Sequence, residues 1–137
     1  MKIKTAELDG PALAWAVGMA EGSRVYRMRV ARPIDWKGED DNRWVVRAQV
    51  PNVGWFADYV YQPHTDPLQA WPIIDREDIT WSMNMEPEHG DATRFCAFSY
   101  KVGSSKAQNG PTKLTAIMRC YVAYKLGDTI EIPEELL

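Results

Sequence analysis

The chain has 137 residues, 45% of them hydrophobic and 26% charged, with a net charge of −3. This composition is typical of one soluble globular domain, and we interpret residues 1–137 as a single domain. The small acidic excess argues against a general nucleic-acid binder. The sequence contains neither a signal peptide nor an apolar run of roughly 20 residues, which predicts a cytoplasmic protein without membrane contact.

The chain begins with a predicted short strand, residues 2–8, followed by a helix. Pro11 suits the first helical position, where a missing N–H costs nothing. Gly22 is a natural end for this helix. Gly18 inside it weakens the helix by about 1 kcal/mol relative to Ala.

Two alternating segments, residues 23–30 and 43–50, come next and predict strands. They can pair as a hairpin around the charged loop 31–43, which would place their arginines on one face. Residues 51–66 are aromatic and loosely patterned, and we expect part of this stretch to be a strand.

The second half of the chain opens with a short helix at Asp66-Pro67. Pro72 predicts a break or kink in it, because proline cannot donate to the preceding turn. Residues 77–85 end in a strand, ITWSM, and residues 93–102 form a second strand, so we expect a hairpin. The stretch 103–110 contains Ser, Gly and Asn and is predicted to be a flexible connection.

The strongest predicted element is the amphipathic helix between Gly110 and Gly127, with Pro111 at its first position. Arg119 and the helix lysines are expected on its solvent side, and residues 129–132 should add a short edge strand. The fold class predicted is α+β, a small antiparallel β-sheet with the N-terminal and C-terminal helices packed on one face. The main helix should bury these apolar residues: Leu114, Ile117, Met118 and Tyr121.

Three stretches carry a family resemblance: residues 1–22, DPLQAWPIIDRED at 66–78, and residues 111–137. Together they resemble the NinX-like family of small proteins from tailed bacteriophages and prophages. Residues 23–63 depart from the short form of that family and are interpreted as a family-specific insertion or a diverged segment. The resemblance implies a phage accessory protein in the cytoplasm of the bacterial host, dispensable for virion building, and it supplies no catalytic residues.

Patterns for nucleophilic or metal chemistry are weak. Cys96 and Cys120 lie inside apolar runs, which favours reduced core residues over a disulfide. The two histidines are His64, in a proline-containing loop, and His89, in the acidic turn 86–91. We interpret that turn as solvated rather than metal-binding, and we expect no metal, no cofactor and no enzymatic activity.

Two further charged or glycine-containing stretches have ordinary interpretations. Residues 75–78 are interpreted as a surface ion-pair cluster rather than as proton-transfer groups. Gly103-Ser104-Ser105-Lys106 precedes the main helix and can in principle hold an anion there, but it lacks the spacing of a Walker loop. A flexible linker is the preferred interpretation.

Six tryptophans, interleaved with arginines, are the most informative feature of the composition. Aromatic faces stack on bases and arginine binds phosphate, so such a set suits a nucleotide. The alternative is that Trp71 and Trp81 belong to the core and the other tryptophans are loop anchors. The predicted ligand-binding residues are Trp44, Arg47, Trp55, Tyr59, Trp71 and Arg76.

Three functions remain open at this point. The first is non-enzymatic binding of a small nucleotide-like ligand, for example to sequester a host immune signal, by a homo-oligomer. The second is modulation of a host or phage protein through an exposed apolar patch. The third, less favoured, is a nucleic-acid-associated factor that uses the arginines of residues 24–47.

Overall fold

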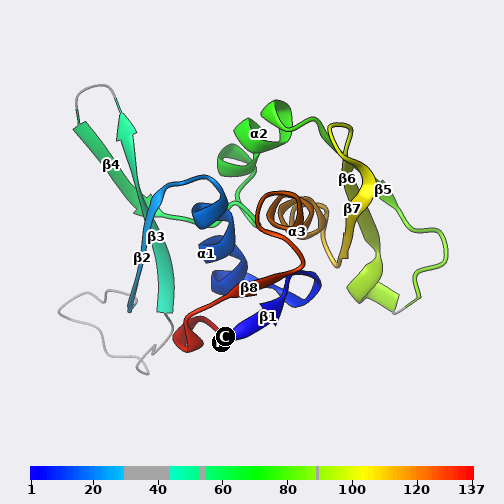
Figure 1. The fold of residues 1–137 in the computed structure, drawn as a ribbon, viewed down its shortest axis with the longest axis horizontal. Helices are drawn as coiled ribbons and strands as arrows, with labels where there is room; N and C mark the ends of the chain where they lie inside the picture. Colours follow the sequence, from blue (N-terminus) through cyan, green and yellow to red (C-terminus); the bar gives the residue numbers. More distant parts are fainter. Residues whose placement is uncertain (30–43, 53–54, 89) are drawn as a thin grey trace, which may run out of the picture.

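The computed structural model describes residues 1–29, 44–52, 55–88 and 90–137. At its centre lie two helices, α1 (Gly10–Ala20) and α3 (Lys113–Leu126), with a sheet on either side of the pair (Figure 1). A third helix, α2 (Pro67–Arg76), lies at one end of this arrangement. The predicted α+β class is confirmed, and the C-terminal helix packs on an antiparallel sheet.

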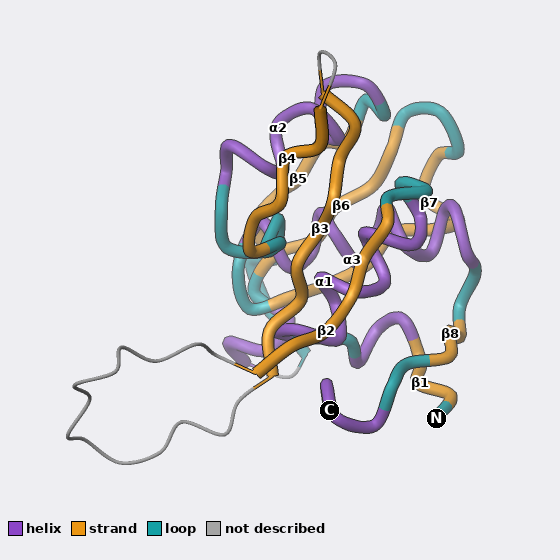
Figure 2. Tube along the Cα trace, turned by 90° about the vertical axis from the view of Figure 1, so that its left-hand side faces the viewer, coloured by secondary structure: helices purple, strands orange, loops and turns teal. Residues whose placement is uncertain are grey.

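The strands form three small antiparallel sheets. The two three-stranded sheets pack on opposite sides of the central helix pair. One of them, β2-β3-β4, lies in front of α1 in Figure 2. The strands, sheet by sheet, are β1 (Lys2–Lys4) with β8 (Thr129–Glu131); β2 (Arg24–Arg29), β3 (Trp44–Asn52) and β4 (Trp55–Val60); and β5 (Ile79–Met83), β6 (Phe95–Ser99) and β7 (Gly103–Gly110).

Both predicted hairpins are present. β2 pairs with β3 from Arg24 opposite Gln49 to Arg29 opposite Trp44, and the loop predicted between them lies outside the described residues. β5 pairs with β6 from Ile79 opposite Ser99. The short strand predicted near the C-terminus is also confirmed, and its partner is β1 at the start of the chain.

Helix α1 begins as predicted, with the Asp9 carboxylate accepting a hydrogen bond from the Gly10 N–H at 2.8 Å and proline in the first turn. Gly18 has a packing role that the sequence did not reveal. A Cβ at this position would lie 2.2 Å from Cγ1 of Val25 on β2. The missing side chain is therefore what allows α1 and β2 to approach each other closely.

Helix α3 begins later than predicted. Thr112, rather than Gly110-Pro111, is the N-cap, and its hydroxyl accepts a hydrogen bond from the Thr115 N–H at 3.1 Å. Gly127 ends the helix with a φ of 100°, as expected. Ile117, Met118 and Tyr121 are buried as predicted, and Leu114 is half-buried.

Arg119 was expected on the solvent side of α3 but is buried. The helix is covered all round from residue 115 to residue 123, because α1 lies against it as well as the sheet. The guanidinium donates from Nε to the Leu8 carbonyl at 2.7 Å and from Nη1 to the Asn109 carbonyl at 2.9 Å. These hydrogen bonds satisfy donors of the buried Arg119 guanidinium, which the helical periodicity had predicted to face solvent.

Two further expectations need correction. Helix α2 continues through Pro72 to Arg76, so the predicted break was wrong, while the alternative of a kink stays a prediction. Pro72 has no N–H to donate to the Leu68 carbonyl. Leu68 is 86% exposed, so a water molecule can donate to this carbonyl instead. Residues 103–110 form strand β7 rather than a flexible connection, which also removes the loop needed for the anion-binding interpretation.

The core is one cluster of aliphatic and aromatic side chains between the helices and the sheets. Neither Trp71 nor Trp81 belongs to it, since they are 63% and 42% exposed, so the core interpretation of these two residues was wrong. Both cysteines are free thiols, with Cys120 buried and Cys96 half-buried, and burial raises the pKa of the Cys120 thiol to about 11. None of the helices in the described part is long and apolar enough to cross a membrane.

Candidate functional site

A cleft of about 960 Å³ lies where β4 leaves β3. It is bounded by the start of α1, the first residues of β3, the loop after β4 and the C-terminal 3-10 helix, Glu134–Leu136. We call it the His64 cleft. Its lining residues are Asp9, Gly10, Pro11, Val45, Val46, Val60, Tyr61, Gln62, His64, Thr65, Glu135, Leu136 and Leu137.

The cleft follows from the strand register. β4 pairs with β3 only from Arg47 opposite Val60 onward, so the first residues of β3 lack a β4 neighbour. The Tyr61 N–H still donates to the Val46 carbonyl at 2.8 Å. The chain then turns away, with the N–H groups of residues 65 and 66 both donating to the Gln62 carbonyl. This turn places the side chain of His64 in the cleft wall.

His64 is the most informative polar group of the cleft. Its Nδ1 is buried and has no hydrogen-bond partner among the described residues. Burial lowers the pKa of the imidazole below its ordinary 6.5, and the nearby Asp9 carboxylate opposes this shift in part. The ring is therefore neutral at pH 7, with one nitrogen able to donate a hydrogen bond and the other able to accept one.

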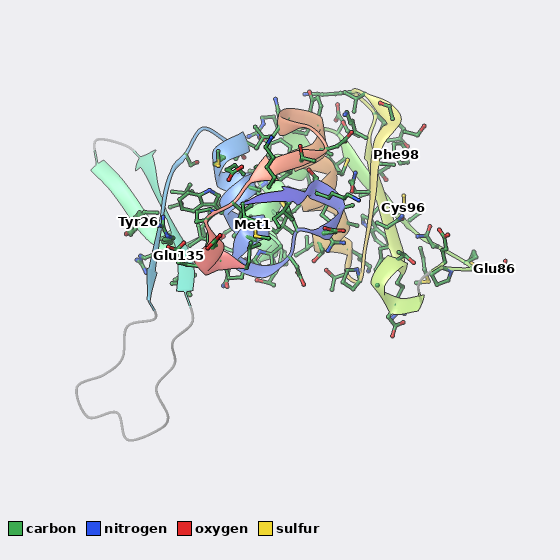
Figure 3. The ribbon with its side chains drawn as sticks, turned by 60° about the horizontal axis from the view of Figure 1, so that its bottom comes forward. Met1, Tyr26, Glu86, Cys96, Phe98 and Glu135 are labelled. Atoms are coloured by element: carbon green, nitrogen blue, oxygen red, sulfur yellow. The ribbon has the colours of Figure 1, made fainter. Side chains whose placement is uncertain are left out.

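The outer rim of the cleft carries a paired charge. Glu135 forms an ion pair with Arg27 of β2, with Oε2 of Glu135 3.3 Å from Nε of Arg27. Tyr26 and Glu135 lie next to each other where β2 meets the C-terminal segment (Figure 3). The Arg27 guanidinium contributes to holding the pKa of Glu135 below its usual value, after the larger effect of a backbone hydrogen bond. The rim is thus close to neutral, and the interior is mostly apolar.

The six predicted ligand-binding residues divide between two places. Trp44, Arg47, Trp55 and Tyr59 belong to the sheet β2-β3-β4. Trp44 pairs with Arg29 at one end of β3 and Trp55 with Asn52 at the other. At about 3.3 Å per residue, the backbones of the two tryptophans are roughly 25 Å apart. Arg47 is half-buried beside the cleft residue Val46.

Trp71 and Arg76 lie on α2, away from the cleft lining. Arg76 has structural partners: its Nη2 donates to Glu21 at 2.8 Å and its Nε donates to Glu77 at 3.0 Å. Burial alone would lower the pKa of Arg76, but the hydrogen bonds to these two carboxylates raise it overall. The prediction that Trp71 and Arg76 bind a ligand remains a prediction.

Glu77, expected in a surface cluster, is instead buried at 4% exposure. Three cations surround its carboxylate: Arg76, Lys101 and Lys125, the last two with Nζ 3.7 Å from a carboxylate oxygen. Burial alone would raise the pKa of Glu77, but the Arg76 hydrogen bond and the lysine charges outweigh it, so the pKa is lowered. The cluster joins α2, α3 and the β6–β7 turn.

The sequence raised His64 only as a candidate for metal binding or acid–base catalysis and did not reveal its cleft. The other lining residues come from three separate parts of the chain, residues 9–11, 45–65 and 135–137, so no local motif predicts them. Among the described residues, no group of three or more His, Cys, Asp or Glu side chains could hold a metal ion.

Comparison with protein families identifies a match. The family model described as "Bacteriophage P22, NinX" matches residues 4–125, most of the chain. No curated protein matches it. The matched range includes the His64 loop and β3 and β4.

Proposed function

Given that this chain belongs to the bacteriophage P22 NinX family, we propose that it is a non-enzymatic phage accessory protein that binds a small nucleotide-like ligand in the His64 cleft. The observation that carries the proposal is the buried, unpartnered Nδ1 of His64 in the wall of a cleft large enough for a ligand. Small-molecule sites are typically about 300–1,000 Å³ and mostly apolar, with a few convergent polar groups.

The side chains around His64 favour a base over a free phosphate. Val45 and Val60 offer apolar surface, and the neutral imidazole can exchange hydrogen bonds with the polar edge of a base. The Asp9 carboxylate, which lies near the His64 ring, would repel a phosphate placed beside that ring. The phosphate end would therefore point outward along β3, where Arg47 follows Val46 in the strand.

The biological use proposed for such binding is removal of a signal. A protein that binds a nucleotide-like molecule without converting it lowers its free concentration in the host cytoplasm. Sequestration of a host immune signal would serve an accessory protein of a phage, and it requires tight binding rather than turnover.

Thermal melting of the purified full chain against nucleosides and mono-, di- and cyclic nucleotides tests the proposal. A ligand at about 100 times its dissociation constant adds about 2.7 kcal/mol to the free energy of unfolding. At about 3–5 °C per kcal/mol for this chain length, Tm should rise by roughly 8–13 °C. If no compound of the panel raises Tm, the proposal is wrong.

Two variants place the site. His64→Gln should weaken binding of the best ligand by at least about tenfold, because it replaces the ring whose hydrogen bonds the ligand uses. Trp71→Ala is the matched control, since Trp71 is 63% exposed and outside the cleft lining. Binding that survives His64→Gln but is lost in Trp71→Ala would move the site to α2.

A second function, modulation of a host or phage protein, is favoured by one specific observation. Leu68 and Trp71 are 86% and 63% exposed and lie three residues apart on one side of α2. Large apolar side chains exposed together are typical of protein-binding surfaces. A photocrosslinker at Leu68 should then capture one discrete protein in infected cells, and Trp71→Ser should abolish the capture. A crosslinker at Glu7, an exposed residue outside α2, is the control.

A further inference from the structure

Gln69, in the first turn of α2, is hydrogen-bonded to the backbone on both sides of Tyr61. Its side-chain oxygen accepts from the Gln62 N–H at 2.7 Å, and its side-chain nitrogen donates to the Val60 carbonyl at 2.9 Å. A backbone N–H can only donate and a carbonyl can only accept, so these two partners fix which end of the amide is the oxygen. The half-buried Gln69 amide therefore uses both of its ends on one short segment.

These two hydrogen bonds take the place of a neighbouring strand. The Tyr61 N–H points toward β3, where it donates to the Val46 carbonyl. Backbone groups alternate in direction along a strand, so the Val60 carbonyl and the Gln62 N–H point to the opposite edge. Within the described ranges, no strand pairs with β4 at that edge. The Gln69 amide supplies one donor and one acceptor there, as the backbone of a paired strand would.

The segment that follows β4, residues 61–66, is tied to the same turn of α2 at its other end. The N–H groups of Thr65 and Asp66 donate to the Gln62 carbonyl at 3.0 and 2.9 Å. The Asp66 carbonyl accepts from the Gln69 N–H at 3.1 Å. Gln69 thus binds residues 61–66 at both ends, through its side chain at the start and through its backbone at the finish. His64 lies within the segment closed in this way.

We propose that Gln69 is the positioning residue of the His64 cleft, because the segment that it closes holds the imidazole in the cleft wall. The proposal rests on the proposed function, since positioning matters only if the cleft takes a ligand. Gln69 is not among the lining residues and acts through His64. Without its two side-chain bonds, residues 61–66 should open while the rest of the domain stays folded. A ligand that uses the imidazole then binds only the closed fraction, which lowers its apparent affinity.

NMR titration of the His64 ring in the full chain without ligand tests the positioning directly. Burial lowers the pKa of His64 in the wild type, and the charged side chains that line the cleft are Asp9 and Glu135. Gln69→Met keeps the size of the side chain and removes both hydrogen bonds, so water should reach the ring and its pKa should rise toward 6.5. Gln108→Met is the matched control and should leave the pKa unchanged. Gln108 is a half-buried glutamine on β7 whose side chain makes no hydrogen bond among the described residues.

Hydrogen exchange at the Gln62 N–H gives a second measurement, graded by a conservative variant. Gln69→Met should speed exchange there at least about tenfold, because this N–H loses its acceptor. Gln69→Glu keeps an acceptor for Gln62 and loses the donor to Val60, so its rate should lie between those of wild type and Gln69→Met. Circular dichroism verifies that each variant is folded.

Binding of the nucleotide that raises Tm most in the melting panel completes the test. Its dissociation constant should rise at least about tenfold in Gln69→Met and stay unchanged in Gln108→Met. Unchanged His64 titration and unchanged Gln62 exchange in a folded Gln69→Met variant would overturn the proposal, and so would undiminished affinity. A raised pKa together with a panel in which nothing binds would support the positioning and overturn the proposed function alone.

Discussion

The two three-stranded sheets are similar in size, but they are attached to the central helices in different ways. Sheet β2-β3-β4 packs on α1 through small and aliphatic side chains, with Val46 and Ala48 buried and Gly18 allowing close approach. Sheet β5-β6-β7 is fastened to its surroundings by polar groups as well. The Ser99 hydroxyl donates to the Glu77 carbonyl, and Arg119 donates to the Asn109 carbonyl.

Two sheets packed on the same helix pair can therefore be stabilised differently. The β2-β3-β4 half depends on close apolar packing, and the β5-β6-β7 half depends in addition on buried charged and polar groups. Close apolar packing is sensitive to a single added methyl group and indifferent to pH. A buried carboxylate among cations is sensitive to protonation. The two halves should therefore respond differently to volume changes and to acid, and the following variants separate them.

Ile117→Asp should have the largest effect, because Ile117 is 2% exposed on α3, the helix that lies between the two halves. Burying an unpaired carboxylate there should unfold the whole domain. Ile117→Val is the control and should cost only about 0.5–1.5 kcal/mol. Far-UV circular dichroism and chemical denaturation report both. A folded, cooperative Ile117→Asp variant would contradict the burial of this helix.

Glu77→Gln should destabilise the β5-β6-β7 half by about 1–3 kcal/mol, because it leaves three cations around a neutral amide. This is less than for a fully buried pair, since the three cations are half-exposed. Asp75→Asn, at an exposed position near the end of α2, is the control and should cost little. Urea denaturation at pH 7 measures both variants.

The pKa of Glu77 predicts the direction in which acid changes the stability of the β5-β6-β7 half. The folded pKa of Glu77 lies below its ordinary value of 4.5. Its contribution is therefore complete above pH 4.5 and is lost as pH falls through the lower, folded pKa. Wild type should lose more stability than Glu77→Gln between about pH 5 and pH 3. Equal losses would show that Glu77 is not the acid-sensitive group.

Gly18→Ala should destabilise the β2-β3-β4 half by about 1–2 kcal/mol. The added Cβ would lie 2.2 Å from Cγ1 of Val25, which costs more than the roughly 1 kcal/mol that alanine gains in a helix. In a Val25→Ala background Cγ1 is absent and the nearest atom to the added Cβ is Cβ of residue 25 at 3.3 Å, so the same change should cost much less. A double-mutant cycle of denaturation midpoints measures the coupling, and a zero coupling energy would contradict the close approach.

Protonation of His64 should have the smallest effect of these changes on the free energy of unfolding. The folded pKa of this imidazole lies below 6.5, so its contribution to stability is present above pH 6.5 and lost as pH falls toward the folded value. The slope is at most about 1.4 kcal/mol per pH unit for one proton. His64→Gln should therefore flatten the stability profile between about pH 7 and pH 5.5. Thermal melting across this range measures the difference.

Local signals predicted most of the elements. Pro11 after Asp9 marked the start of α1, and the alternating strands predicted both hairpins. β7 was missed because GSSKAQNG has no apolar alternation, and its pairing with β6 is a tertiary fact. Arg119 was misplaced because helical periodicity cannot report that a second helix covers the other side.

The candidate site was less predictable than the fold. Aromatic and arginine content located the β3–β4 region but not the cleft, whose polar groups Asp9, His64 and Glu135 are far apart in sequence. Each of these residues has an ordinary local role, such as the helix cap at Asp9. Only the folded chain brings them to one place, so no spacing rule could have found them.

The pairing of the first strand with the last has a consequence for synthesis in the cell. Lys2 pairs with Glu131, and Lys4 pairs with Thr129. At about 5–20 residues per second, a ribosome needs roughly 6–25 s between making the first partner and the second. Throughout that interval β1 has no strand to pair with, although α1 can already form. The sheet β1-β8 can therefore close only after residue 131 has left the exit tunnel.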